Sequence, residues 1–78
     1  MMRILVTPHG DLGRVLAGGQ RSLTVELEAG ATVAGLLARL GLGPEEVWLI
    51  RHNRQRATVE QTLTDGDALE LFAVVGGG

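Results

Sequence analysis

The chain has 78 residues, a formal net charge of −2, two histidines and no cysteine. This length fits one domain with a small core, because a chain of this size buries only somewhat over ~60% of its unfolded surface. The net negative charge argues against a protein that binds polyanions. Without cysteine the chain has no disulfide, thiolate metal site or cysteine nucleophile, and two histidines are too few for a histidine metal site.

Two strands are predicted in the first third of the chain. Residues 2–7 place apolar or β-branched side chains at alternate positions, which is the period of a strand, and Pro8 is expected to end it. Residues 9–21 are rich in glycine and predict a broad hairpin loop in which Leu12, Val15 and Leu16 pack locally. Residues 22–28 alternate again and predict a second strand with one solvated face.

A short helix with one apolar stripe is predicted next. Thr32 occupies the N-cap position, and Gly41 is expected to end the helix. The apolar stripe has the i, i+3, i+4, i+7 spacing and consists of Val33, Leu36, Leu37 and Leu40. Gly35 costs about 1 kcal/mol relative to alanine inside a helix, so we expect the helix backbone to lie close against a sheet at this position.

The second half of the chain predicts two or three further strands. Residues 43–46 predict a turn or a single helical turn, and residues 47–52 an interior strand in which the sole tryptophan, Trp48, is partly buried. Residues 53–56 predict a polar reversal, and residues 57–59 a brief edge strand. Asp65, Gly66 and Asp67 supply turn chemistry before a last strand at residues 68–72, with Gly66 free to adopt positive φ.

These elements predict an α+β domain in which a sheet of four or five strands carries one helix on one face. The helix stripe is expected to pack on strand residues that point to one face of the sheet: Ile4, Val6, Leu23, Val25, Leu27, Leu69 and Leu71. The other face of the sheet is left open. Leu5, Leu49 and Phe72 are expected on this face, which is a candidate partner surface.

The chain ends in three glycines, Gly76, Gly77 and Gly78. A terminus without Cβ atoms can be threaded into a narrow slot, and its ionised carboxylate can attack a phosphorus atom. Residues 73–78, here called the tail, reach at most about 20 Å when extended. The domain is therefore expected to span residues 1–72, with a flexible tail at 73–78. The alternative is a frayed end or a linker scar.

Three segments, in this order, carry a family resemblance: Gly-Ala-Thr-Val-Ala-Gly-Leu-Leu at residues 30–37, Leu-Thr-Asp-Gly-Asp-Ala-Leu-Glu-Leu-Phe at residues 63–72, and the terminal Gly-Gly. Together with the preceding hairpin, they resemble the ThiS/MoaD family of ubiquitin-like sulfur carriers over nearly the whole chain. Two departures stand out. The sequence before the glycines lacks the Pro-Pro of many molybdopterin-type members, and Arg54 follows Asn53 where the family often has glycine.

The resemblance implies a mixed β-grasp sheet with the first and last strands side by side at its centre. It also implies that the chain is not an enzyme and binds no cofactor. A partner adenylating enzyme, related to the ubiquitin activators, would use ATP and magnesium to adenylate Gly78. A persulfide donor would then convert the end to a thiocarboxylate, and a sulfur-accepting synthase would receive the sulfur, with the pathway (molybdopterin, thiamin, tRNA or cysteine) unassigned.

For this function, Gly77 and Gly78 would form the activated end. The expected partner contacts are Leu5, Phe72, Val74, Val75 and Gly76, with Phe72 as an aromatic anchor or, alternatively, an ordinary half-buried strand residue. Two other functions stay open on the same fold. One is a ubiquitin-like modifier that is conjugated to lysines, and the other is an interaction module with an inert tail.

Other residue clusters have plainer interpretations. Asp65 and Asp67 are interpreted as turn formers rather than an acid/base pair or a metal site. Arg51, Arg54 and Arg56 are interpreted as a solvated edge rather than a nucleic-acid contact. No apolar stretch is long enough for a signal peptide or a membrane span, so we expect a cytoplasmic protein with no nucleic-acid or membrane partner.

Overall fold

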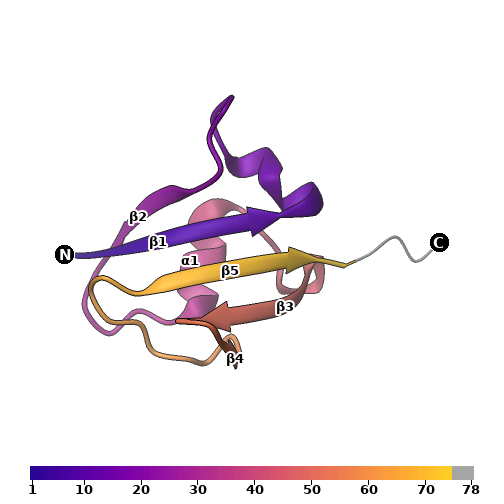
Figure 1. Ribbon diagram of the computed structural model, residues 1–78. Helices are drawn as coiled ribbons and strands as arrows, with labels where there is room; N and C mark the ends of the chain where they lie inside the picture. The colour runs from indigo at the N-terminus through magenta and orange to yellow at the C-terminus, as the bar shows by residue number, and fades with distance from the viewer. Residues whose placement is uncertain (75–78) are drawn as a thin grey trace.

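The computed structural model describes residues 1–74 and contains a five-stranded mixed sheet with the strand order β2-β1-β5-β3-β4. At its centre, β1 (Met2–His9) and β5 (Ala68–Ala73) run parallel. The remaining strands, β2 (Leu23–Leu27), β3 (Val47–His52) and β4 (Gln55–Ala57), are antiparallel to their neighbours. The helix α1 (Val33–Leu40) covers one face of this sheet (Figure 1), which confirms the predicted α+β architecture and the central pairing of first and last strands.

The strand β1 is longer than predicted, because it continues through Pro8 to His9. Leu5 donates its N–H to the carbonyl of Asp67 on the β5 side, so the nitrogens of Val6 and Pro8 point toward β2. Pairing with β2 ends at Val6. A proline beyond that point removes no ladder hydrogen bond, and this is why it does not end the strand.

The helix begins and ends where the sequence predicts. The Oγ1 atom of Thr32 accepts the N–H of Gly35 at 3.4 Å, and Gly41 terminates the helix in the left-handed conformation with φ of 76°. The predicted close approach at Gly35 is wrong. Gly35 is exposed, and a Cβ atom built there would meet only Thr32 Oγ1, at 4.0 Å.

The core lies between α1 and the sheet and includes most of the predicted residues, with Leu23 and Leu40 only half-buried at its margin. Several members come from segments without helical or strand periodicity. Leu12 lies in the 3₁₀ helix η1 (Gly10–Val15), where a loop was predicted, and Leu42 and Leu63 lie in connections. These side chains are buried in the same core as those of the sheet and the helix.

The β3–β4 hairpin is tighter than predicted. Asn53 and Arg54 both have positive φ, 51° and 72°, and form a two-residue turn, so that His52 pairs directly with Gln55. The edge strand β4 therefore occupies residues 55–57 rather than the predicted 57–59. The predicted single helical turn before β3 is confirmed as the 3₁₀ helix η2 (Pro44–Glu46).

No helix in the described part of the chain is both long and apolar enough to cross a membrane. Within residues 1–74, no three histidine, cysteine, aspartate or glutamate side chains are grouped so that they could hold a metal ion.

Candidate functional site

The face of the sheet opposite α1, here called the open face, carries exposed apolar side chains. Leu5 is 47% exposed, Trp48 62% and Val74 52%, and Phe72 is half-buried. Leu49 pairs with Phe72 across β3 and β5 and is also half-buried. The predicted positions of Leu5, Leu49 and Phe72 on this face are therefore confirmed.

The structure does not bring Leu5 and Phe72 together, although both are expected partner contacts on the same face. In the parallel β1–β5 pair, Leu5 lies opposite Ala68, whereas Phe72 lies opposite His9. Four residues of strand separate the two side chains by roughly 13 Å along the sheet. The neighbour of Phe72 is His9, whose ring stacks on the phenyl ring with centroids 4.5 Å apart and planes 8° apart.

The predicted partial burial of Trp48 is wrong, because this residue is 62% exposed. The register between β3 and β5 shifts between Val47 and Leu49, so Trp48 is the extra residue of a β-bulge. A bulge redirects the side chain that it carries. Strand periodicity could not reveal this, because the shift depends on the pairing with β5.

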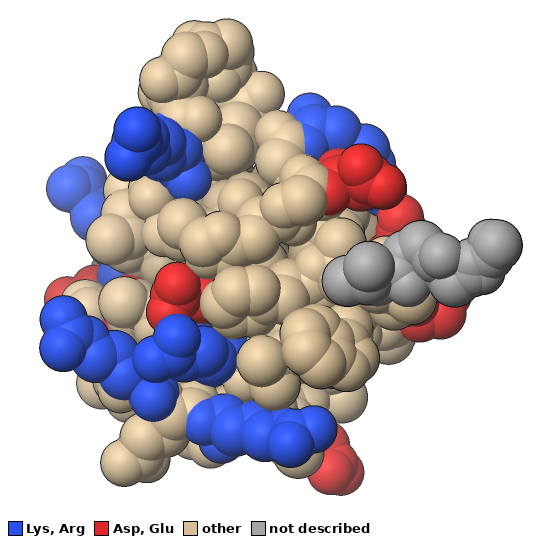
Figure 2. All heavy atoms as spheres, turned by 45° about the vertical axis from the view of Figure 1, so that its right-hand side comes forward, with Lys and Arg blue, Asp and Glu red and all other residues tan. Residues whose placement is uncertain are grey.

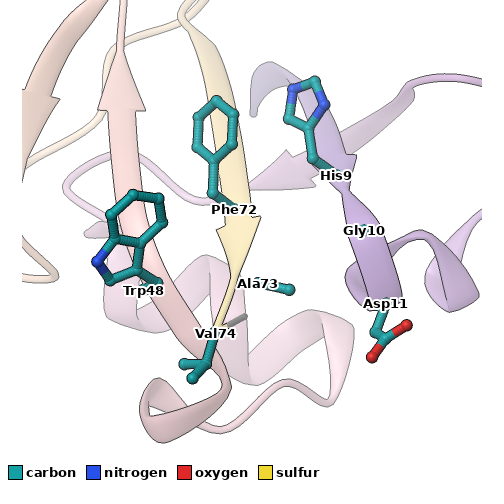
Figure 3. A pocket seen from close by; sticks show the side chains of 7 residues that line it. All are labelled: His9, Gly10, Asp11, Trp48, Phe72, Ala73 and Val74. Carbon is teal, nitrogen blue, oxygen red and sulfur yellow. The ribbon is translucent and has the colours of Figure 1, made fainter. Parts of the chain in front are cut away.

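A groove lies on the open face where β5 ends, with a volume of about 320 Å³. Its lining residues are His9, Gly10, Asp11, Trp48, Phe72, Ala73 and Val74. Figure 3 shows the side chains of Trp48 from β3, Phe72 from β5 and His9 from β1 side by side across three adjacent strands. The last described residues of the chain therefore form part of the groove.

The backbone beyond β5 is held against η2. The N–H of Val74 donates to the carbonyl of Glu46 at 3.3 Å. The Glu46 side chain accepts the N–H of Gly43 at 2.8 Å and forms an ion pair with Arg14, and both interactions hold the pKa of this carboxyl below its usual value. The chain therefore leaves the sheet after Ala73 in a defined direction.

Charged side chains are unevenly distributed on the side of the molecule that carries the end of β5. Figure 2 shows that arginine side chains gather at the lower left of this view, while uncharged side chains occupy its centre. Arg51, which is half-buried, pairs with Glu70 at 3.4 Å, whereas Arg54 and Arg56 are exposed. Arg54 and Arg56 are therefore solvated, as the sequence predicts, whereas Arg51 lies on the interior strand β3.

Asp67 connects the turn before β5 to the β3–β4 hairpin. Its Oδ2 atom lies 2.6 Å from Nε2 of His52 and accepts the N–H of Thr64 at 2.8 Å, and its Oδ1 atom accepts the amide of Asn53 at 3.1 Å. Burial raises the pKa of Asp67, but the hydrogen bonds from His52, Thr64 and Asn53 outweigh it and hold the pKa below its usual value. The predicted turn is confirmed; its link to the hairpin was not predicted.

The remaining predicted site residues, Val75, Gly76, Gly77 and Gly78, lie outside the described residues. The last strand ends at Ala73, one residue later than predicted.

Solved structures of several small proteins are similar to this one. Small archaeal modifier protein 1 of Haloferax volcanii has a TM-score of 0.76 and 22% identity, with 96% of this chain and 100% of that chain covered. The putative molybdopterin converting factor subunit 1 of Pyrococcus furiosus has a TM-score of 0.74 and 20% identity, with 96% of this chain and 100% of that chain covered. A chain from a complex of subunits 1 and 2 of the molybdopterin-converting factor of Helicobacter pylori has a TM-score of 0.64 and 20% identity, with 99% of this chain and 100% of that chain covered.

These likenesses identify the fold as the ubiquitin-like β-grasp that the resemblance implied. No curated protein sequence matches the chain. The sequence model of the ThiS family, in contrast, matches residues 14–78, which is most of the chain. The chain therefore belongs to the ThiS family.

Proposed function

We propose that this protein is a cytoplasmic sulfur carrier, which serves as the substrate of a ubiquitin-activator-like adenylating enzyme and catalyses nothing itself. In the partner's site, with ATP and magnesium, the carboxylate of Gly78 attacks the α-phosphate, giving an acyl-adenylate and pyrophosphate. The terminal sulfur of a persulfide donor then displaces AMP. A thiol next cleaves the resulting S–S bond and releases the thiocarboxylate.

The observation that carries the proposal is the ThiS family match, which extends through the terminal glycines at residues 76–78. The geometry at the end of β5 supports it. This strand is paired on both sides, with β1 and β3, and its end lies at the groove that Trp48 and Phe72 line. Four residues follow Val74 and reach at most about 14 Å from it when extended. A partner bound at the groove is therefore within reach of the terminal carboxylate.

We propose that the partner contacts Phe72, Val74, Val75 and Gly76 near the reactive end. Leu5 would contact the same partner farther along the open face, roughly 13 Å from Phe72. Both Leu5 and Val74 are about half exposed and make apolar area available for burial. Gly77 and Gly78 would enter the partner's active site.

The sulfur acceptor is proposed to be a synthase that binds the same protein after thiocarboxylate formation. A similar structure comes from a complex of subunits 1 and 2 of a molybdopterin-converting factor, which supports a partner of this kind. The sulfur could be destined for molybdopterin, thiamin, tRNA or cysteine, and neighbouring genes would distinguish these pathways.

A second candidate function is conjugation to lysines of other proteins. It is favoured by the structural similarity to a small archaeal modifier protein. Both functions begin with the same adenylate, so they diverge only in the nucleophile that removes AMP. A β-grasp interaction module with an inert tail is the third possibility.

Intact mass measurement separates these functions. The protein is incubated with ATP, magnesium, the adenylating enzyme of the same organism and a persulfide donor. Exchange of one oxygen for one sulfur is the result expected for a carrier, and adducts joined to lysines would identify a modifier. As a positive control, the same enzyme preparation must activate a carrier already known to be its substrate. If it does and the mass of this protein stays unchanged, both the carrier and the modifier functions are refuted.

Deletion of Gly78 is the matched variant for this assay. It should abolish pyrophosphate release while leaving the melting temperature within about 1 °C, because the described core ends at Ala73. Full activity of the deletion variant would show that the reactive group lies elsewhere.

A further inference from the structure

Three arginines lie together where β3 and β4 form one side of the open face. Arg51 and Arg56 pair directly across these two strands, so their side chains point to the same face of the sheet. Arg51 forms an ion pair with Glu70 at 3.4 Å, and Glu70 shares the open face with Phe72, two residues along β5. Arg54 and Glu70 line one depression in the surface. Arg51, Arg54 and Arg56 are here called the arginine patch, and Figure 2 shows arginine side chains gathered on this side.

The arginine patch is positive although the protein as a whole carries a net charge of −2. One carboxylate, that of Glu70, pairs with the patch, and it contacts Arg51. Arg54 and Arg56 are exposed, and neither forms an ion pair with any side chain of residues 1–74. Two guanidinium groups are therefore available to carboxylates from outside the molecule.

The local structure disfavours arginine at positions 54 and 56. Arg54 has a φ of 72°, in a two-residue hairpin turn whose second position favours glycine. Arg56 lies opposite Arg51, and like charges directly opposite each other on neighbouring strands are destabilising. Residues that go against a local preference, with no compensating contact in the fold, are candidates for a role in function. Binding to a partner accounts for both positions.

A partner that receives the tail and lies on the open face also covers the arginine patch. Because β3 and β5 are antiparallel, the turn that contains Arg54 lies where β5 begins (Figure 1). Leu69, which pairs with His52 beside this turn, precedes Val74 by five residues, or roughly 17 Å along the sheet. A stable interface covers about 800 Å² on each protein, which is roughly 30 Å across. Such an interface therefore reaches from Val74 to the arginine patch.

The chemistry of the patch selects the surface that can cover it. Burial of a guanidinium group without a counter-charge is costly, and the fork of N–H groups of arginine matches a carboxylate. The patch borders the apolar side chains of Leu49 and Phe72 on the same face. An apolar centre with a polar rim is typical of an interface between proteins, whereas nucleic-acid interfaces are more polar and much more positively charged.

We propose that the adenylating partner places an acidic surface, formed by aspartate or glutamate side chains, against Arg54 and Arg56. This inference rests on the proposed function and assigns the partner's chemistry at that contact. The two ends of the interface then have separate roles. Apolar contacts at the end of β5 hold the tail in place, and the charged contacts at the arginine patch speed association and fix the orientation of the carrier.

The test is the salt dependence of KM for pyrophosphate release by the adenylating enzyme of the same organism, with this protein as the varied substrate. The double variant Arg54→Gly/Arg56→Gln should raise KM about 10-fold at low salt and leave kcat within about twofold, because rim charges act on association and lie far from the reacting carboxylate. The difference from the wild-type protein should shrink as salt is added. A wild-type KM for the double variant at low salt would overturn the inference.

Arg39→Gln is the matched control for Arg56→Gln. Both substitutions remove one exposed arginine, but Arg39 lies on α1, which covers the other face of the sheet. At low salt we expect Arg56→Gln to raise KM about threefold or more and Arg39→Gln to leave it unchanged. Equal effects of the two substitutions would reduce the interaction to net charge and refute a localised contact.

The single variant Arg54→Gly separates binding from folding. It should raise the melting temperature, because glycine relieves the positive φ, and yet raise KM about threefold at low salt. Weaker binding by a more stable protein cannot result from damage to the fold. A wild-type KM for this variant would overturn the assignment of Arg54.

Two further outcomes separate the inference from its alternatives. Fluorescence anisotropy with a labelled polyuridine oligonucleotide should show no binding at physiological salt; binding that the double variant loses would identify nucleic acid as the occupant and overturn the inference. If the wild-type protein supports no pyrophosphate release, the proposed function fails together with the inference. If release is normal and the double variant keeps a wild-type KM, the inference alone fails.

Discussion

Replacement of Gly35 by alanine should stabilise the protein. Gly35 lies in the first turn of α1, is exposed, and has space for a Cβ atom, whose nearest contact would be Thr32 Oγ1 at 4.0 Å. Glycine is about 0.8–1.0 kcal/mol less favourable than alanine in a helix interior. Because the first turn expresses only part of this difference, we expect a gain of about 0.5–1 kcal/mol. For a domain of this size, that raises the melting temperature by roughly 2–8 °C.

Gly41→Ala is the control for this substitution. A Cβ atom at Gly41 would meet nothing within 4 Å, but the φ of 76° is a conformation that only glycine adopts readily. We expect Gly41→Ala to destabilise the protein by about 1–2 kcal/mol. Both variants can be measured by thermal unfolding followed by circular dichroism. A lowered melting temperature for Gly35→Ala would refute the reasoning and would indicate that the helix needs glycine there.

Three further substitutions test the fold. Asp67→Asn should lower stability at neutral pH and should make the loss of stability below about pH 4 smaller than in the wild-type protein. The reason is that the folded state lowers the pKa of Asp67: such a carboxylate stabilises the protein above its unfolded pKa, and this contribution is lost as pH falls through the folded pKa. Melting temperatures at pH 7, 4 and 3 would show this, and parallel losses in both proteins would contradict it. Arg54→Gly should gain about 1 kcal/mol in urea unfolding, because φ there is 72°, whereas unchanged stability would mean that the turn is unstrained. Leu36→Ala, at a fully buried position, should cost about 3–5 kcal/mol; a loss below 1 kcal/mol would place this side chain outside the core.

The sequence predicts best the elements that depend on local interactions. The N-cap Thr32, the apolar stripe and the terminating Gly41 all act within one helix, so its limits follow from neighbouring residues. The positive φ of Gly66 was predicted for the same reason, since the turn Asp65-Gly66-Asp67 sets it locally.

The features that the sequence did not reveal depend on pairing between distant segments. Whether Pro8 ends a strand depends on where β2 stops, and the exposure of Trp48 depends on a register shift against β5. The separation of Leu5 from Phe72 likewise follows from the parallel register of β1 and β5. The groove was therefore predicted only in part: Phe72 and Val74 were expected, but His9, Asp11 and Trp48 were not.

The central position of β5 has a consequence for how the protein is made. This strand bridges the hairpin β1–β2 to the hairpin β3–β4, yet it follows all four of these strands in the chain. A nascent chain that lacks it holds two separate hairpins with unpaired edges and an incomplete core. The sheet can therefore assemble only after β5 has been translated. A truncated product would stay unfolded and open to proteolysis.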